Sequence, residues 1–413
     1  MKKIGIIGGG AAGFFAAINI AQQGIKAEIT ILERSKEVLQ KVKISGGGRC
    51  NITHACYDVE QLTKNYPRGQ KALRGPFNKF QPRDTIEWFA RQGIKIVEEA
   101  DGRMFPSTND SQTVIDCFVR LCEKWKIEVL TQTRVTQITK LNSGWELDSS
   151  LGTFYFDILI VAGGSSEGLW NILEKQGLKI IPPVPSLFSC NIKDEILNGL
   201  AGISIPNVLV NVEGRKHISS GPCVITHWGL SGPAFLKLSA WEARFFHEKQ
   251  YKLCLEVNWL GVAKNRETFL QELVELKSEN AKKKVLKDPK YGLPARLWAA
   301  LVASVGIEEN ENWADLNKAK LAALSQVLCA CKLETQGKTT NKDEFVTCGG
   351  VDLGEIDFRT MEVKQHQNMY IIGEILDIDA VTGGFNFQAA WTEAWIVAQS
   401  IKEKEEEQKE LEK

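Results

Sequence analysis

The feature that most constrains the fold is a glycine-rich turn near the N-terminus, set between two short apolar strands. Residues 2–7 predict a strand, and the glycines that follow at positions 8, 10 and 13 fit the pattern G-x-G-x-x-G. Residues 11–23 predict a helix, and residues 27–32 predict a second strand that ends at Glu33. A strand, turn, helix and strand in this order form the βαβ unit of a parallel sheet. The chain is therefore expected to be an α/β protein.

The same segment predicts a dinucleotide site. Gly8 permits the tight turn, Gly10 lets a pyrophosphate approach the backbone, and Gly13 allows the helix to pack closely on the sheet. The free N–H groups at the helix N-terminus favour the negative phosphates. Glu33 follows at the usual spacing of about 20 residues, where a carboxylate can accept hydrogen bonds from the adenosine ribose.

Two later segments favour FAD over NAD. Residues 45–51 read SGGGRCN, whose consecutive glycines let the backbone lie against a flat ring, while Arg49 could pair with a phosphate. Residues 369–374 predict a strand ending in Gly373-Glu374, and residues 383–386 precede a helix predicted to run to about residue 401. In FAD folds built from two segments, such a carboxylate bonds the ribitol and the helix N-terminus faces the flavin pyrimidine.

The predicted FAD contacts come from these loops and from the strand ends beside them. They are Gly8, Gly10, Ala11, Ala12, Gly13, Glu33, Arg34, Lys43, Gly46, Gly47, Gly48, Arg49, Cys50, Asn51, Val135, Ala162, Gly163, Gly164, Gly373, Glu374, Asp377, Gly384, Phe385 and Asn386.

The domain organisation follows from a proline cluster at residues 182–185, which cannot lie in a helix or a central strand and so predicts a junction. We expect a first FAD-binding segment over residues 1–185 and a second over 345–413, which contains the C-terminal helix. Between them, residues 186–344 form an insertion, β-rich over 186–260 and helical over 261–335. Further strands are predicted at 129–135, 145–147 and 154–161.

Composition excludes several classes of protein. Lys and Arg number 51, as do Asp and Glu, so the protein is not coated in basic residues, although a local basic face is allowed. The ten cysteines show no spacing typical of a metal site, so no metal is expected. No apolar stretch is long enough to span a bilayer, and the N-terminus leaves no room for a signal peptide before the first strand. We therefore expect a cytoplasmic protein without a membrane partner.

Several motifs together resemble those of the bacterial YhiN-like flavoproteins, a family that includes BaiN-like reductases and RdsA-type ribosomal RNA dihydrouridine synthases. The resemblance covers nearly the whole chain and rests on residues 8–13, 45–51, 102–106, 226–233, 349–352, 360–361, 373–377 and 383–388. The chain departs from the family at residues 165–170, where a longer Pro- and Gly-rich segment is usual. The resemblance implies FAD, a glutathione-reductase-like Rossmann domain and an inserted middle region.

The resemblance also implies the reduction of a carbon–carbon double bond conjugated to a carbonyl. The first hypothesis is the conversion of uridine to dihydrouridine in ribosomal RNA, which would make that RNA a partner. The second is the reduction of a small-molecule enone with NAD(P)H, and the third is a non-catalytic flavin-binding protein that senses redox state or binds RNA. NAD(P)H would have to dock transiently, because no second G-x-G-x-x-G follows a strand. The oligomeric state is not predicted.

Cys50 and His227 are the candidates for the acid that protonates the substrate. Cys50 follows Arg49, which would lower the pKa of its thiol, and imidazole titrates in a useful range. Either residue could instead have only a packing or turn role. A separate basic cluster could contact RNA phosphates or be a solvated helix face, and two aromatic residues nearby could stack on bases or belong to the core. The cluster contains Lys282, Lys283, Lys284, Lys287, Lys290 and Arg296, and the aromatic residues are Tyr291 and Trp298.

Overall fold

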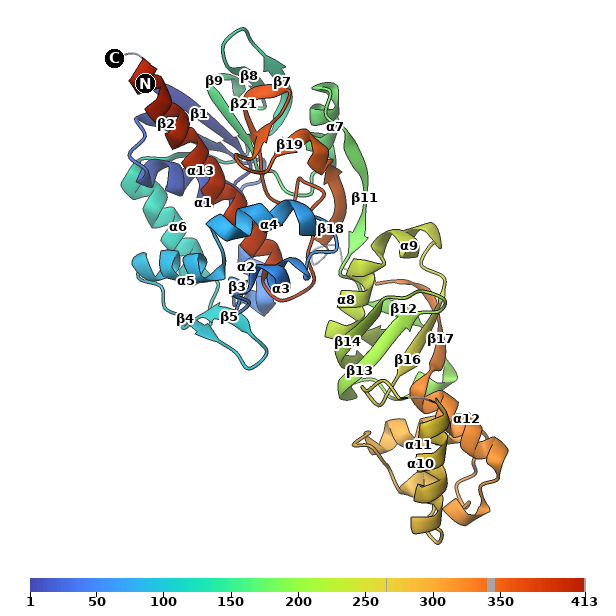
Figure 1. Ribbon diagram of the computed structural model, residues 1–413. Coiled ribbons are helices and arrows are strands. Elements are labelled where there is room, and N and C mark those ends of the chain that lie inside the picture. The colour runs from blue at the N-terminus through green and yellow to red at the C-terminus, as the bar shows by residue number, and fades with distance from the viewer. Residues whose placement is uncertain (265, 340–345, 412–413) are drawn as a thin grey trace. The chain divides into compact units, whose positions relative to one another are not determined.

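The computed structural model describes residues 1–264, 266–339 and 346–411. The chain divides into two compact units (Figure 1). Unit 1 combines Met1–Pro183 with Val346–Lys413, and unit 2 is Val184–Phe345. The predicted boundary at residues 344–345 lies outside the described residues.

Unit 1 is built on a seven-stranded sheet with the order β19-β20-β21-β10-β1-β2-β6. From β21 to β6 every neighbouring pair is parallel, which confirms the predicted α/β class. β19 and β20 add an antiparallel edge. The strands are β1 (Lys2–Ile7), β2 (Ala27–Leu32), β6 (Glu128–Leu130), β10 (Ile158–Val161), β19 (Ile356–Asp357), β20 (Glu362–Val363) and β21 (His366–Ile371).

Two helices from opposite ends of the chain pack together in unit 1. α1 (Ala11–Gln22) is buried along most of its length and lies beside α13 (Phe385–Leu411), as Figure 1 shows. The ring of Phe15 on α1 lies 5.0 Å from that of Trp391 on α13. α13 is mostly buried as far as Ile401 and then continues as a charged helical extension to Leu411.

Unit 1 also contains further helices and two small sheets besides the seven-stranded sheet and the α1–α13 pair. The helices are α2 (Gln40–Gly48), α3 (Val59–Thr63), α4 (Gln70–Lys79), α5 (Pro82–Arg91), α6 (Gln112–Trp125) and α7 (Glu167–Lys175). Two three-stranded sheets contain β3 (Thr53–His54), β4 (Ile96–Glu98) and β5 (Arg103–Pro106), and β7 (Val135–Lys140), β8 (Trp145–Ser149) and β9 (Gly152–Phe156). The proline cluster lies in β11 (Ile180–Ser186), which forms a two-stranded sheet with β18 (Val346–Val351) in the described part of the chain, so the missing N–H groups disrupt no central ladder there.

Two predicted strands are each divided into two. The apolar run 154–161 changes partners at Asp157, because β9 pairs antiparallel with β8 whereas β10 pairs parallel with β1. The Asp157 carboxylate accepts a hydrogen bond from the Lys3 N–H at 2.7 Å, which fixes this corner. The predicted strand 129–135 is likewise broken by a turn, where Gln132 has a φ of 54°.

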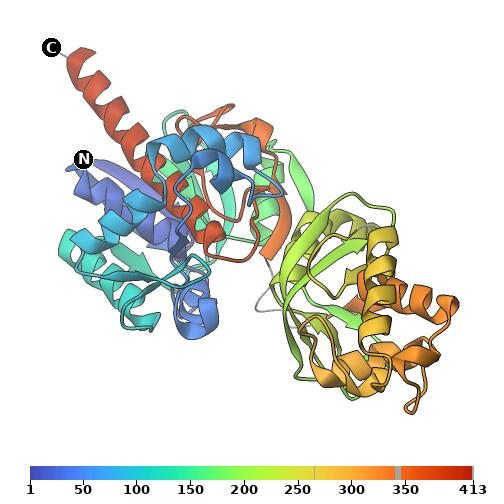
Figure 2. The ribbon, with the colours of Figure 1, turned by 60° about the horizontal axis from the view of Figure 1, so that its bottom comes forward.

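Unit 2 contains a closed six-stranded antiparallel barrel, visible in Figure 2. Alternating apolar residues such as Val208, Val210 and Val212 fill its interior. The strand order is β12 (Cys190–Ile192), β15 (Gly229–Ser231), β14 (Ile218–Ile225), β13 (Ser204–Val212), β16 (Cys254–Asn258) and β17 (Cys331–Lys338).

Helices complete unit 2. α8 (Pro233–Trp241) packs on β13 and β14, and α9 (Ala243–Glu248) follows it. α10 (Arg266–Glu279), α11 (Ala295–Ser304) and α12 (Lys318–Cys329) form the predicted helical part. The expectation that it extends to residue 335 was wrong, because β17 begins at Cys331 and closes the barrel. Among the described residues, no helix has the length and apolar character needed to cross a membrane.

Candidate cofactor and active site

The G-x-G-x-x-G loop leaves open space at the N-terminus of α1. Gly8 has a φ of 114°, and a Cβ there would lie 2.4 Å from the carbonyl oxygen of Ala162. A Cβ on Gly13 would lie 2.0 Å from the carbonyl oxygen of Gly8, so both positions require glycine. A Cβ on Gly10 would meet nothing within 4 Å. The backbone N–H groups of the first helical turn, which begins at Ala11, therefore border a space suited to phosphate.

The Glu33 carboxylate is held beside this loop. Its Oε2 accepts a hydrogen bond from the Gly9 N–H at 2.8 Å, and its Oε1 accepts one from the Ser35 N–H at 2.7 Å. The Thr133 N–H donates to the Glu33 carbonyl at 2.7 Å, which brings the start of β7, at Val135, towards the same strand end. Such a carboxylate keeps lone pairs for two ribose hydroxyls.

The segments after β10 and β21 reach the same edge of the sheet. The Ala162 N–H donates to the Ile7 carbonyl at 2.8 Å, so Ala162 and the two glycines after it lie next to the turn at Gly8. Gly373 follows β21, and a Cβ on it would lie 3.1 Å from the Cβ of Ala12. The structure therefore brings the two predicted segments of the dinucleotide site together.

The glycine loop over residues 45–51 contacts the start of α13. Gly46, Gly47 and Gly48 all have positive φ values, and a Cβ on either of the last two would meet open space. The Asn51 amide donates to the Thr53 carbonyl and accepts from the Gly384 N–H, both at 3.0 Å. A flat ring could therefore lie between this loop and the helix N-terminus.

In addition to Glu33, Asn51 and Glu374, four predicted contact residues have side chains that already bond within the protein. The Arg49 guanidinium donates to Glu99 at 2.7 Å and lies 3.9 Å from the centre of the Phe105 ring, so a phosphate would have to compete with Glu99. Lys43 forms a surface ion pair with Glu37 at 3.7 Å. Arg34 donates to Ser166 at 3.3 Å.

The fourth, the Asn386 side chain, makes two hydrogen bonds to the backbone of Ala380, at 2.9 and 3.2 Å. Phe385 is buried, and its carbonyl accepts a hydrogen bond from the Tyr66 hydroxyl at 2.6 Å. The side chains of Asn386 and Phe385 are therefore occupied within the protein. A ligand at the start of α13 would be bound by the backbone instead. The Asp377 N–H donates to the Val351 carbonyl at 3.0 Å, which fixes the intervening loop.

Cys50 is not an activated thiol. It is completely buried, and burial raises the pKa of its thiol to about 12, with a hydrogen bond to Ser45 as a smaller opposing effect. The prediction that Arg49 lowers this pKa was wrong, because burial dominates and Arg49 is paired with Glu99. A thiol with this pKa is a poor proton donor at neutral pH.

His227 lies in unit 2, in the turn between β14 and β15. Its side chain is exposed, and the side chain of the neighbouring Trp228 is 68% exposed. The Thr226 hydroxyl accepts hydrogen bonds from the N–H groups of Trp228 and Gly229, at 3.3 and 3.2 Å, which shape the turn. A catalytic role for His227 remains a prediction.

Two residues beside the predicted site were missed. His54 lies on β3, with its Nδ1 3.0 Å from the Gly383 carbonyl oxygen and its ring 4.5 Å from the Phe385 ring. Glu393 is a fully buried acid on α13. The sequence contains a signal for each of them. His54 is a histidine just after the glycine loop, and Glu393 is a single acidic residue in a mainly apolar stretch of the predicted helix.

The lysine cluster lies in a turn and in the 3-10 helix η2 (Val285–Lys287), so its interpretation as a helix face was wrong. Most of its lysines contact side chains of unit 2. Lys290 and Lys287 form ion pairs with Asp288 and Glu309 at 2.5 and 3.0 Å, while Lys283 and Lys284 donate to Asn280 and Asn310. Trp298 is buried in the core, so it cannot stack on a base, whereas Tyr291 is 38% exposed.

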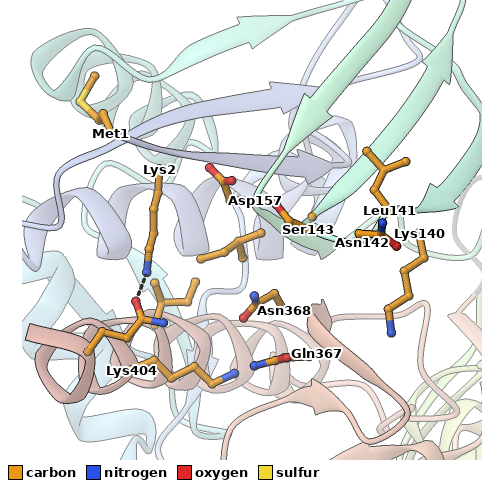
Figure 3. Close-up of a pocket in the computed structure, with 14 residues that line it drawn as sticks. Met1, Lys2, Lys140, Leu141, Asn142, Ser143, Asp157, Gln367, Asn368 and Lys404 are labelled. Carbon is orange, nitrogen blue, oxygen red and sulfur yellow. Dashed lines mark hydrogen bonds between the residues drawn. The ribbon is translucent and has the colours of Figure 1, made fainter. Parts of the chain in front are cut away.

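A separate polar pocket of about 570 Å³ opens at the opposite edge of the sheet (Figure 3). Its lining includes Lys2 at the start of β1 and Ile158 at the start of β10. Lys2 Nζ donates to Gln408 Oε1 across it at 2.9 Å. The glycine turn follows the other ends of these parallel strands, so this pocket is not the dinucleotide site. No group of three or more His, Cys, Asp or Glu side chains that could hold a metal occurs in the described parts of the chain.

The fold and the loops define the class of the protein. A parallel sheet with this glycine turn, and a late strand and helix that return to the same edge, form the FAD-binding Rossmann domain of FAD-dependent oxidoreductases. The chain belongs to the HI0933-like protein Rossmann domain family, whose model matches residues 2–400. An enzyme of this class does not fit the third, non-catalytic hypothesis.

Similar proteins cover almost the whole chain. The ribosomal RNA dihydrouridine synthase of Escherichia coli (strain K12) is 30% identical, over 96% of this chain and 97% of its own length. The 3-dehydro-bile acid delta(4,6)-reductase of Clostridium scindens is 26% identical, over 98% of this chain and 100% of its own. The solved structure of the 3-ketosteroid-delta4-(5alpha)-dehydrogenase of Rhodococcus jostii RHA1 has a TM-score of 0.52 at 11% identity, covers 97% of each chain and shows the fold alone.

Replacing Glu374 with alanine is expected to weaken FAD binding by about 1–3 kcal/mol, the effect of losing a charged hydrogen-bonding partner. Glu374 forms an ion pair with Lys41, and its Oε1 accepts from the Thr347 N–H at 3.1 Å. Flavin retention on dilution measures the change. Lys41→Ala is the control, since an equal loss in that variant would show that Glu374 acts only through the ion pair. Unchanged retention in Glu374→Ala would contradict direct binding.

Proposed function

We propose that this enzyme reduces a carbon–carbon double bond conjugated to a carbonyl, and that its substrate is a uridine in ribosomal RNA, which becomes dihydrouridine. The observation that carries the proposal is the similarity of 30% identity, over nearly the full length of both chains, to an enzyme named for that reaction. The proposal is also supported by the loops at one edge of the unit 1 sheet, which fit FAD.

Each part of FAD has a candidate partner at that edge. We assign the pyrophosphate to the N–H groups that begin α1, the adenosine ribose to Glu33, and the ribitol to Glu374. The flavin ring would lie between Gly47-Gly48 and the start of α13, whose positive end stabilises negative charge on the ring. When bound and reduced, FAD supplies a hydride to one carbon of the substrate double bond.

The reduction also needs a proton for the other carbon of the double bond, which comes from a side chain or from solvent. The buried Cys50 thiol, with a pKa of about 12, does not suit this step. Imidazole is better suited to proton transfer near neutral pH. His54 lies beside Gly383 at the start of α13, and His227 is exposed on unit 2, so we assign the step to one of these two histidines.

The second candidate is the reduction of a small-molecule enone with NAD(P)H as the electron donor. The similarity to the bile acid reductase, which extends over 98% of this chain, favours it. The lysine cluster of unit 2 does not favour RNA over this alternative, because most of its charges already contact side chains of the same unit.

Mass spectrometry of ribosomal RNA from cells lacking the gene tests the proposal. We expect dihydrouridine to be lost from the ribosomal RNA and then restored by the wild-type chain. A chain carrying Gly10→Asp, which we expect to lose the cofactor, should not restore it. If dihydrouridine is unchanged in the deleted cells, while small enones oxidise the reduced flavin of the purified protein, the second candidate replaces the first.

A further inference from the structure

Glu393 is a buried acid with an incomplete set of hydrogen bonds. It lies on α13, between the N-terminus of this helix and its charged extension, and its side chain is 0% exposed. Its Oε2 accepts a hydrogen bond from the Gly373 N–H at 2.5 Å, whereas its Oε1 has no hydrogen-bond partner. A buried polar atom without a partner is costly and uncommon, so its retention in a helix packed on α1 needs an explanation.

The carboxyl group connects elements of both chain segments that build the dinucleotide site. Gly373 has a φ of 79°, and it packs against Ala12 in the first turn of α1. Ala12 lies directly after the open space at Gly10, where we assign the pyrophosphate. Glu393 therefore fixes, through the Gly373 backbone, the position at which the late strand meets the phosphate-binding helix turn.

Within the described residues, Glu393 forms no ion pair with a lysine, arginine or histidine. Tyr66 is a titratable neighbour whose pKa is affected by Glu393. It is fully buried, and its hydroxyl donates a hydrogen bond to the Phe385 carbonyl. Burial, and then Glu393 and Cys56, raise the pKa of Tyr66 well above its usual value, so Tyr66 stays neutral.

Burial raises the pKa of Glu393 itself to about 8, with the hydrogen bond from Gly373 as the smaller, opposing effect. The carboxyl is therefore mainly protonated at pH 7 and ionises as the pH rises through 8. An unfolded chain would lose this proton near pH 4.5, so the folded state loses stability between pH 4.5 and 8. An ionised Glu393 would place an uncompensated charge, in surroundings of low dielectric constant, behind the turn that receives two phosphates.

We propose that Glu393 is a positioning residue for FAD: its carboxyl holds Gly373 against α1, and the loss of its proton weakens dinucleotide binding because it places a negative charge behind the turn that receives the phosphates. FAD binding is then linked to the uptake of a proton at a site that the cofactor need not touch. This inference concerns the cofactor only, and it stands whichever substrate the enzyme reduces.

The test measures FAD dissociation constants of the deflavinated full-length chain, by flavin fluorescence, from pH 6.5 to 9.5. If only the protonated form binds, a group with a pKa of about 8 makes binding about tenfold weaker at pH 9 than at pH 7. Glu393→Gln keeps the shape without ionising, so its dissociation constant should change by less than about twofold over this range. Glu403→Gln, an exposed acid on the same helix, should behave like the wild type.

Two results would overturn the inference: a wild-type dissociation constant that does not change with pH, or a Glu393→Gln variant with the same loss as the wild type. If the glutamine variant does not fold, titration calorimetry of the wild type decides. At pH 8, in buffers of different ionisation enthalpy, we expect an uptake of about half a proton per FAD bound, because half of Glu393 is then ionised. An uptake of zero would reject the link.

Discussion

A Gly10→Asp variant is expected to fold but to be purified without FAD. A side chain at this position meets no protein atom within 4 Å, so the fold itself tolerates the change. The new carboxylate would instead occupy the space in front of the first turn of α1, where a pyrophosphate must lie. Two like charges about 4 Å apart near a protein surface repel by about 4 kcal/mol, which corresponds to a loss of affinity on the order of a thousandfold. The ratio of flavin to protein absorbance measures it.

The matched control is Gly75→Asp. Gly75 lies on α4 of the same unit, and a Cβ there also meets nothing within 4 Å. This variant should keep its full flavin content, and after removal of the flavin its melting temperature should be close to that of Gly10→Asp. Full FAD occupancy in Gly10→Asp would mean that the open space at the start of α1 does not receive the pyrophosphate.

The second large effect is expected for the ion pair between Arg68 and Asp379. Arg68 precedes α4, and Asp379 lies in the loop between β21 and α13, so the pair joins the two chain segments of unit 1. The Asp379 side chain is 0% exposed and that of Arg68 is 15% exposed. Removing one partner of a buried ion pair typically costs about 3–5 kcal/mol. Arg68→Met should therefore lower the free energy of unfolding, measured in urea, by this amount.

Arg359→Met provides the comparison. Arg359 pairs with Asp357 at 2.7 Å, but its side chain is 85% exposed, and exposed pairs contribute about 0–1 kcal/mol. An Arg68→Met variant that is no less stable than Arg359→Met would show that the buried pair contributes little to joining the two segments.

The parts of the site predicted from the sequence are those determined by backbone geometry. Gly8 and Gly13 are required because a Cβ would collide with a carbonyl oxygen, and such a constraint leaves the same glycine spacing wherever this turn occurs. Glu33 could be predicted because it comes directly after β2, the strand next to the glycine turn. These restrictions act over a few residues, so a local pattern can reveal them.

The parts that were missed depend on contacts between distant residues. In the run 154–161 the charged residue Asp157 is the sign that the strand partner changes, but the residues on either side of it are apolar and resemble one continuous strand. β17 was predicted as helix, although apolar and charged residues alternate from Cys331 to Glu334, which is the period of a strand. The raised pKa of Cys50 and the role of Glu393 depend on burial, which a single sequence does not show.

The pairing of β11 with β18 has a consequence for the order in which the protein folds. Gly349 lies so close to Pro182 that a Cβ on it would be 2.6 Å from the Pro182 carbonyl oxygen, so the chain leaves unit 1 and returns to it at one place. To unit 1, the whole of unit 2 is a single loop of about 160 residues, and closing a flexible loop of that length costs roughly 4–5 kcal/mol of chain entropy. If unit 2 has already formed its barrel, most of that entropy is lost before closure. Unit 1 then assembles most easily when unit 2 has already folded, even though the first residues of the chain belong to unit 1.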